Sequence, residues 1–389
     1  KKGAFFRIVV PDVWNGDLVI WNHGFSLSPI GPVSDLGPLA FPVQIPEGYA
    51  VAASSYSQIG WALFKTKKDN DKLIEIFIEN FGVPGQILVN GASLGGIVTA
   101  QAVEELANED SDANITGAFP FCGAVAGSRN WDGAIDLRLV YDFVCSGVPG
   151  AALPGGATGL PSPGFPDFPL TNTQMALAVH ACTGILAPPP FRTPAQAANL
   201  AQILSATTLP ESFLLTDMGF VTFGLSNVIW EKKKLKGKQG VGNANVVYPD
   251  PVIDAGIARV TAHNGGAKKL AKHFTPKGNV GAVKIVSMHT DGDGLVIVEN
   301  EGNYRDVVPA ANLTTAIVDE AGNSHCGFTE AELVAGWESL RGWVAGGPQP
   351  TAAGIQGLCG LIELGGAAGP CRIDPAFPLG VMSDRVPLR

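Results

Sequence analysis

The sequence predicts an α/β protein with a mostly parallel central sheet, helices on both faces of that sheet, and a large inserted cap. The main observation is an alternation of short apolar strands with helices over residues 1–124 and again over residues 278–389. This alternation is typical of parallel sheets that are covered on both faces. Between these stretches, residues 125–277 lose the rhythm and include Gly- and Pro-rich tracts. We therefore expect residues 125–277 to form a cap, or lid, over the carboxyl edge of the sheet.

The composition excludes several classes of protein. Hydrophobic residues make up 46% of the 389 residues, which is enough to bury a sizeable core, so a disordered chain is excluded. The formal net charge of −9 argues against nucleic acid as a partner. The sequence contains no uninterrupted apolar run of about 18 residues, so we expect no membrane span.

The first two strands are expected at residues 5–10 and 17–22, joined by a turn. The second strand runs into His23-Gly24-Phe25. Gly24 allows the backbone to bend, so that the N–H of Phe25 can point inward as one half of an oxyanion hole. We expect His23 to be structural, because in sheets of this kind the catalytic histidine follows the nucleophile in the chain.

A third strand and a helix are expected before the central motif. The strand covers residues 49–56, and the helix opens near Asp69 or Asp71 and closes at Gly82. A further strand at residues 115–121 follows the motif and completes the first run of alternating elements.

The central motif is Gly91-Ala92-Ser93-Leu94-Gly95, between an apolar strand at residues 86–90 and a helix at about 94–107. A G-x-S-x-G sequence in this context predicts a nucleophile elbow, a tight turn that presents the serine. Gly91 and Gly95 flank the turn because a Cβ atom at either position would collide with the neighbouring chain. The helix points its first N–H groups, including that of Leu94, at an oxyanion forming beside Ser93.

The second half of the sheet is expected after the insertion. A strand covers residues 282–289, and the last helix, residues 329–345, begins with a capping box of Thr329 and Glu332. The tail after Pro348 is Gly-rich, and we expect it to have no core of its own.

Ser93 needs a base and an acid before it can act as a nucleophile. A serine hydroxyl gives its proton to a histidine, and an acid holds the tautomer and orientation of that histidine. In sheets of this type the chain order is serine, acid, histidine. His325 is the only histidine after the strand at residues 282–289. Asp291 and Asp293 are the acid candidates, and we favour Asp293 because a turn of small residues followed by Leu-Val is the usual exit after such an acid.

The chain resembles the α/β-hydrolases, specifically the secreted bacterial esterase type. It is also similar to the tannase and feruloyl esterase group in having Cys326 beside the catalytic histidine. It differs from that group at Ala92, where their pattern has Cys, so their hallmark disulfide is absent and specificity for phenolic esters is not carried over. The matching motifs are Trp14-Asn15-Gly16-Asp17-Leu18 before His23-Gly24, then Gly91 to Gly96, Thr290 to Asp293, and His325-Cys326-Gly327-Phe328.

The resemblance implies hydrolysis of a small or polymeric carboxylic ester through an acyl-enzyme, with no metal and no cofactor. Three alternatives stay open. A peptidase of the same fold would need an anchor for a peptide terminus. A lipase would prefer a mobile apolar lid, which residues 175–186 could provide. A non-catalytic binding protein would usually have lost a member of the triad. The oligomeric state is not predicted.

The six cysteines suggest an oxidising compartment, so a secreted or periplasmic protein with its signal peptide removed is expected. Cys359 and Cys371 lie close together in the tail, and Cys145 and Cys182 both lie in the expected cap. Cys122 and Cys326 then form the third pair, or remain two buried free thiols. A Cys122–Cys326 bridge would pin the loop of His325 to the sheet.

Overall fold

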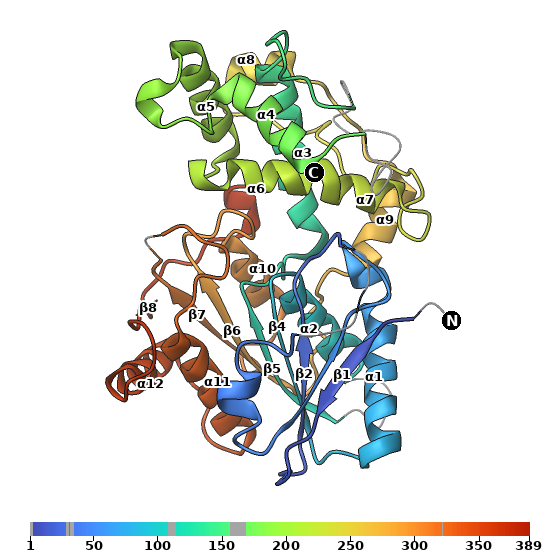
Figure 1. Cartoon of the computed structure of the whole chain (residues 1–389), viewed down its shortest axis with the longest axis vertical. Coiled ribbons are helices and arrows are strands. Elements are labelled where there is room, and N and C mark those ends of the chain that lie inside the picture. The colour runs from blue at the N-terminus through green and yellow to red at the C-terminus, as the bar shows by residue number, and fades with distance from the viewer. Residues whose placement is uncertain (1–2, 29–30, 32–34, 108–113, 156–168, 321) are drawn as a thin grey trace. The chain divides into compact units, whose positions relative to one another are not determined.

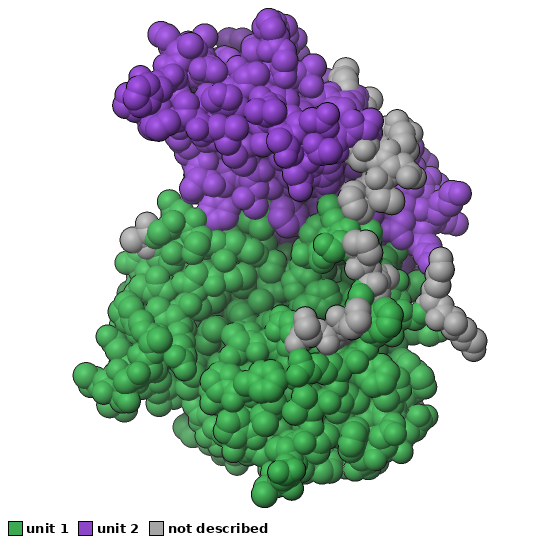
Figure 2. Space-filling model, viewed as in Figure 1, with its two compact units in different colours: residues 1–127, 274–381 green, residues 128–273, 382–389 purple. Residues whose placement is uncertain are grey.

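A computed structural model describes the chain except for residues 1–2, 29–30, 32–34, 108–113, 156–168 and 321 (Figure 1). The chain divides into two compact units (Figure 2). Unit 1 contains residues 1–127 and 274–381, and unit 2 contains residues 128–273 and 382–389. Much of the Gly- and Pro-rich tract at 147–169 lies outside the described residues. The function of residues 125–277 as a cap stays a prediction.

The end of the chain differs from the sequence-based division, which assigned residues 278–389 to the core. Residues 382–389 belong to unit 2 instead. Arg389 Nη2 donates to Asp136 Oδ2 at 2.8 Å, and Arg129 Nη2 donates to the Val386 carbonyl at 2.7 Å. These contacts join segments far apart in the sequence, and a short tail has no periodic pattern that would reveal them.

Unit 1 is built on one eight-stranded sheet with the order β1-β3-β2-β4-β5-β6-β7-β8 (Figure 1). The six inner strands pair in parallel, whereas β1 and β8 are antiparallel edge strands. The strands are β1 (Phe6–Val9), β2 (Leu18–Asn22), β3 (Ala50–Ser54), β4 (Ile87–Ala92), β5 (Ile115–Phe121), β6 (Lys284–Thr290), β7 (Leu313–Val318) and β8 (Ile373–Asp374). The predicted α/β class with a mostly parallel sheet is therefore confirmed.

The inner strands are buried along most of their length because both faces of the sheet are covered. In β2 and β3, every residue is buried. Successive side chains of a strand point to opposite faces of the sheet. A strand between two layers of helices therefore buries side chains at odd and at even positions alike. Val19 and Trp21, for example, join the core cluster on one face, and Leu18 and Ile20 are buried on the other.

Helices of unit 1 cover the two faces of the sheet. On one face, α1 (Thr66–Phe81) and α2 (Leu94–Glu105) pack against each other, and α2 contacts β4 and β5. On the other face, α11 (Glu330–Val344) packs on β5 and β6, beside α12 (Ala352–Leu364). The remaining helical elements are η1 (Ala40–Gln44), η2 (Ala62–Phe64) and α10 (Glu299–Val307). The predicted capping box is present, with Thr329 and Glu332 bonded reciprocally at the start of α11.

Helix α1 begins earlier than the expected start near Asp69 or Asp71. It begins at Thr66, whose hydroxyl donates to Gln101 Oε1 at 2.6 Å. Asp69 lies in the first turn, where its carboxylate accepts from the Ser57 N–H at 2.8 Å. The first turn is therefore held by partners distant in sequence, which a search for a local cap does not detect.

The tail after Pro348 has no core of its own, as expected, but it contains a helix that packs into the core of unit 1. Residues 352–364 form α12, whose Ile355 and Cys359 are fully buried in the core cluster of unit 1. Gly lowers helix stability, but the apolar residues of this segment recur at helical spacing and pack on α11, β7 and β8. Tertiary packing thus outweighs the low helix propensity of the glycines.

All the regular secondary structure in the described residues of unit 2 is helical, and loops such as residues 231–250 join the helices. Helix α3 contacts α5, α6, α7 and α8, and α4 contacts α5 and α6. Its elements are η3 (Gly127–Arg129, which begins at the boundary), α3 (Asn130–Val144), α4 (Asn172–Thr183), η5 (Pro189–Phe191), α5 (Pro194–Thr207), η6 (Glu211–Phe213), α6 (Leu214–Gly219), η7 (Phe220–Gly224), α7 (Leu225–Trp230), α8 (Pro251–Gly256), α9 (Asn264–Lys272) and η8 (Met382–Asp384).

One helical stretch of unit 2, Glu211–Trp230, is long and apolar enough to cross a membrane by length and composition. It contains η6, α6, η7 and α7 in succession. Of the 18 most apolar consecutive residues in this stretch, 72% are buried in the structure. A buried helix in the core of a globular unit has the same composition, and this stretch packs against α3.

Three disulfides join the six cysteines, and no cysteine is free. Cys122–Cys326 lies in unit 1, Cys145–Cys182 links α3 to α4 in unit 2, and Cys359–Cys371 closes the segment that contains the end of α12. These are the three pairs expected from the sequence.

Candidate active site

The turn at Ser93 connects β4 directly to α2. Ser93 has φ 58° and ψ −123°, a strained conformation for a residue with a side chain. A Cβ atom on Gly95 would overlap the Asn22 carbonyl, and one on Gly91 would overlap the Gly95 carbonyl. Only glycine fits at either position, because the chain passes too close to β2 and to itself. The turn therefore has the geometry of a nucleophile elbow.

Ser93, His325 and Asp293 form one chain of hydrogen bonds. The distance from His325 Nε2 to Ser93 Oγ is 2.7 Å, and that from His325 Nδ1 to Asp293 Oδ2 is 2.6 Å. The side chain of Asp293 is fully buried, and that of His325 is 22% exposed. With a proton on Nδ1, His325 donates to the carboxylate and accepts from the Ser93 hydroxyl, which is the arrangement that activates a serine.

Asp293, and not Asp291, is the carboxylate that contacts His325. Asp293 Oδ1 accepts from the N–H groups of Leu295 and Val296, both at 3.0 Å. Asp291 Oδ1 instead accepts from the Glu320 N–H at 2.8 Å. Burial tends to raise the pKa of Asp293, but the hydrogen bond with His325 and the nearby ring of His289 outweigh it and lower that pKa below its ordinary value. Asp293 is therefore held as a carboxylate.

The loop that carries His325 is fastened at several points. Cys326 is bonded to Cys122, which directly follows β5 and donates its N–H to the Met288 carbonyl at 2.8 Å. Glu320 accepts from the Ser324 N–H at 2.7 Å, and Arg372 Nη2 donates to the Gly327 carbonyl at 2.6 Å. These bonds limit the positions that the imidazole of His325 can adopt.

Two backbone regions lie beside Ser93. Leu94 supplies the first N–H of α2, and the first N–H groups of a helix have no partner within the helix. Gly24 lies against the serine, since a Cβ atom built on it would be 3.6 Å from Ser93 Cβ and 3.9 Å from Ser93 Oγ. The loop that contains Gly24 and Phe25 thus borders the nucleophile. The assignment of the oxyanion hole to Leu94 and Phe25 stays a prediction.

His23 has contacts of a structural kind. Its ring stacks on Tyr56, with centroids 4.0 Å apart, and its Nδ1 lies 2.8 Å from the Gly24 carbonyl. The Tyr56 hydroxyl donates to the His23 carbonyl at 3.0 Å. Burial lowers the pKa of His23. These contacts stiffen the loop that passes Ser93.

Sequence reasoning missed one residue of this site, His289. It lies in β6, is fully buried, and its Nε2 is 3.7 Å from Asp293 Oδ2. A histidine in a strand, four residues before the candidate acid, was the available signal. Its partner Glu301 lies on α10, an element that the sequence analysis did not identify.

Among the described residues, no group of three His, Cys, Asp or Glu side chains is arranged to hold a metal ion. This observation concerns the described residues alone.

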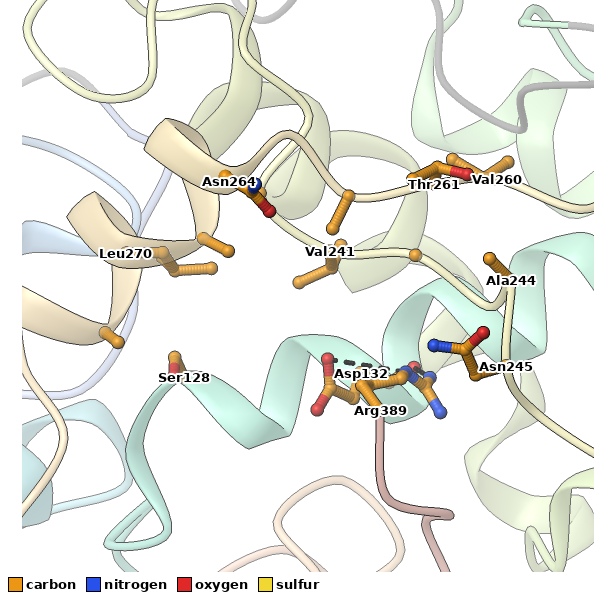
Figure 3. Close-up of a pocket in the computed structure, with 15 residues that line it drawn as sticks. Ser128, Asp132, Val241, Ala244, Asn245, Val260, Thr261, Asn264, Leu270 and Arg389 are labelled. Carbon is orange, nitrogen blue, oxygen red and sulfur yellow. Dashed lines mark hydrogen bonds and ion pairs between the residues drawn. The ribbon is translucent and has the colours of Figure 1, made fainter.

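Unit 2 contains a pocket of about 390 Å³ (Figure 3). Asp132 and Arg389 lie on one side of it, with Asp132 Oδ1 3.6 Å from Arg389 Nε, and Val241 and Leu270 line the opposite side. Burial raises the pKa of Asp132 to about 6, although Arg389 and Arg129 oppose this shift. The two charged groups of the pocket pair with each other, and the Ser93 site lies in unit 1.

No family model and no curated protein matches the sequence. Solved structures with a similar course of the chain include lipase A of Candida antarctica, at 11% identity and TM-score 0.46, covering 90% of this chain and 75% of that one. An esterase of Aspergillus oryzae has 14% identity and TM-score 0.43, covering 89% and 77%. Proline iminopeptidase of Mycobacterium smegmatis has 14% identity and TM-score 0.36, covering 91% and 93%.

The fold follows from the topology of this chain itself. The sheet is mostly parallel, its fourth strand ends in an elbow that runs into a helix, and the acid and the histidine lie in loops after β6 and β7. This order of strand, elbow, acid loop and histidine loop is that of the α/β-hydrolases. The chain has the α/β-hydrolase fold.

Proposed function

We propose that this protein is a serine hydrolase that cleaves carboxylic esters through an acyl-enzyme on Ser93. The observation that supports this most is the unbroken chain of hydrogen bonds from Ser93 Oγ through His325 to Asp293. A second support is the placement of Ser93 at the N-terminus of α2, where N–H groups and the helix dipole favour negative charge.

In the proposed acylation step, Ser93 Oγ attacks the ester carbonyl carbon and its proton passes to His325 Nε2. The carbonyl π electrons move to the oxygen, where the Leu94 N–H and, by prediction, the Phe25 N–H bind it. The tetrahedral intermediate then collapses, and the C–O bond to the alcohol breaks. The leaving oxygen takes the proton from His325 Nε2.

Deacylation repeats these steps with water. The oxygen of a water molecule attacks the acyl carbon, and His325 accepts a proton from that water. When the bond to Ser93 breaks, the same proton returns to Ser93 Oγ and a free acid leaves. Asp293 stabilises the imidazolium in both halves and holds Nδ1 protonated. Neither step requires a metal or a cofactor.

Three disulfides support a secreted or periplasmic location, because disulfides persist in oxidising compartments. The proposed substrate is a small or polymeric ester. Unit 2, as the proposed cap, would then determine which acyl and alcohol groups enter.

The test compares hydrolysis of short p-nitrophenyl esters with hydrolysis of peptide anilides. We expect ester turnover that falls by a factor on the order of 10⁶ in Ser93→Ala, because the triad acts as a unit. The matched control is Ser205→Ala, which changes an exposed serine on α5 in unit 2. Faster cleavage of anilides than of esters would favour the peptidase alternative, and unchanged ester turnover in Ser93→Ala would remove Ser93 as the nucleophile.

A further inference from the structure

The buried histidine behind Asp293 faces hydrogen-bond acceptors with both ring nitrogens. His289 Nε2 lies 2.6 Å from the Val296 carbonyl oxygen, and Nδ1 lies 3.2 Å from Glu301 Oε1. A carbonyl only accepts, and an ionised carboxylate only accepts. A ring that donates from both nitrogens is an imidazolium, so this geometry fits a positively charged His289 paired with a negatively charged Glu301.

Asp293 lies between two imidazole rings. Its Oδ2 is 2.6 Å from His325 Nδ1 on one side and 3.7 Å from His289 Nε2 on the other. The side chains of His289, Asp293 and Glu301 are all fully buried. Two buried carboxylates without a cation would repel each other and take up a proton. His289 supplies the positive charge between them.

The other neighbours of His289 on the sheet carry no charge. On β7 its partner is Ile317, and on β5 the residue paired with Met288 is Phe121. From α10, Glu301 faces the ring directly. Tyr304, on the same helix, is buried, and burial together with the charges of Glu104 and Glu301 raises the pKa of Tyr304. The charged groups that act on His289 are therefore Asp293 and Glu301, with His325 beyond Asp293.

We propose that His289 is a positioning residue of the triad: held as an imidazolium by Glu301, it keeps Asp293 ionised and aligned with His325. The proposal rests on the proposed function, since it assigns His289 a part in the same site. His289 acts in two ways. Its charge offsets the cost of burying Asp293 as a carboxylate. Its hydrogen bond to the Val296 carbonyl holds the turn whose Leu295 and Val296 N–H groups bind Asp293 Oδ1.

The directions of the pKa shifts agree with this arrangement. Burial tends to lower the pKa of His289, but the hydrogen bond with Glu301 and the charges of Asp293 and Glu301 raise it above its ordinary value. The positive charge of His289, 3.7 Å away, helps lower the pKa of Asp293 despite burial. With His325 neutral, Asp293, His289 and Glu301 together carry one net negative charge, which then stabilises His325 when it takes the proton from Ser93.

The first test is His289→Gln, which keeps a donor of similar reach toward Val296 but removes the positive charge. Two carboxylates then share a buried space without a cation, so protonation of Asp293 becomes easier. We expect the acid limb of kcat/KM against pH to move up by roughly one pH unit, because loss of the nearby positive charge favours uptake of a proton by the hydrogen-bonded pair of Asp293 and His325. We also expect kcat at pH 6 to fall on the order of tenfold with little change in KM, and to recover toward pH 9.

The control is the double variant His289→Gln/Glu301→Gln. It removes one positive and one negative charge, so the buried group keeps the single net negative charge of the unaltered protein. We expect at least half of the shift in the acid limb to be reversed, although the double variant carries more changes. A purely structural role for His289 would give a double variant that is as impaired as the single one, or more so.

A measurement independent of turnover separates this proposal from the proposed function. NMR of the unaltered protein with labelled histidine should show His289 protonated on both nitrogens at pH 6, and the carboxyl carbon of Asp293 should titrate at higher pH in His289→Gln. If these NMR signals appear but the protein does not hydrolyse esters, the proposed function is refuted and the proposal for His289 is not. A neutral His289 ring, or a folded His289→Gln with an unchanged pH profile and unchanged Asp293 titration, would overturn the proposal.

Discussion

At the residue scale, the environment of Asp293 explains why one of two neighbouring aspartates serves His325. Asp293 accepts three N–H groups in all, two from the backbone of its own turn and one from His325. Asp291 is used to tie its loop to the Glu320 N–H. Two residues of the same type, separated by one glycine, therefore have different functions because the turn directs their side chains to different partners.

Replacing each aspartate by asparagine tests this assignment. Asp293→Asn should lower kcat on the order of 10⁴-fold, because an amide can donate to His325 Nδ1 and so favours the wrong tautomer. Asp291→Asn should lower kcat by less than about tenfold, because its side-chain oxygen can still accept from Glu320. Steady-state kinetics on a p-nitrophenyl ester measure both variants. Greater loss in Asp291→Asn than in Asp293→Asn would show that the assignment is wrong.

The lowered pKa of Asp293 has a consequence for the pH profile. A carboxylate whose pKa lies below its ordinary value stays ionised to lower pH than an ordinary aspartate, so it adds no separate step to the acid limb. The acid limb then reflects the loss of a single proton, and activity rises with pH because a neutral imidazole is the base. A plot of log(kcat/KM) against pH should have a slope of about one on the acid side. A slope near two would contradict a lowered pKa for Asp293.

At the element scale, the elbow depends on close approach of backbone segments. A side chain at Gly95 would overlap the carbonyl groups of Asn22 and His23 at the end of β2. The strand, the turn and the helix can therefore meet only when position 95 has no Cβ atom. The strain at Ser93 is tolerated because β4 and α2 on either side are both fixed by packing.

Two glycine-to-alanine substitutions separate close packing from helix propensity. Gly95→Ala should lower the free energy of unfolding by at least about 2 kcal/mol, because the overlap falls on backbone atoms that cannot rotate away. Gly360→Ala in α12 meets nothing within 4 Å and should raise stability by about 0.5–1 kcal/mol. Urea unfolding measures both. A Gly95→Ala protein as stable as the unaltered one would contradict the close approach at the elbow.

The disulfide Cys122–Cys326 joins the sheet to the histidine loop across 204 residues of sequence. Cys122→Ala with Cys326→Ala should lower the free energy of unfolding by about 2–5 kcal/mol. It should also slow labelling of Ser93 by a fluorophosphonate, since the His325 loop loses its attachment to β5. The matched pair is Cys145→Ala with Cys182→Ala in unit 2, which should lose stability but keep the labelling rate. Equal labelling rates in both double variants would contradict a role of the first bridge in holding His325.

At the scale of the whole molecule, the sequence allowed the fold class and the main members of the candidate site to be predicted. The strands from β1 to β6, the elbow at Ser93 and the capping box at Thr329 are encoded by residues close together in the chain, whereas β7 and β8 were not predicted. Chain order in the fold then led to Asp293 and His325. Local pattern and fold order together therefore identified residues that lie far apart in the sequence.

The remaining features depend on packing that no local pattern reveals. Helix α12 was missed because its glycines disfavour a helix, whereas burial of Ile355 and Cys359 stabilises it. His289 was missed because its importance depends on Glu301, which reaches it from α10. The assignment of residues 382–389 to unit 2 depends on the contacts of Val386 and Arg389 with α3 and the turn before it.

The most direct test of the account is to identify the residue that becomes covalently modified during turnover. The protein is mixed with a p-nitrophenyl ester, quenched within one turnover, digested, and mapped by mass spectrometry. If Ser93 is the nucleophile, we expect a burst of p-nitrophenol close to one equivalent, with the acyl group on the peptide that contains Ser93, and no such peptide from Ser93→Ala. An acyl group on another residue would contradict the assignment of Ser93 as the nucleophile. So would a quenched sample that shows a burst but contains no acylated peptide.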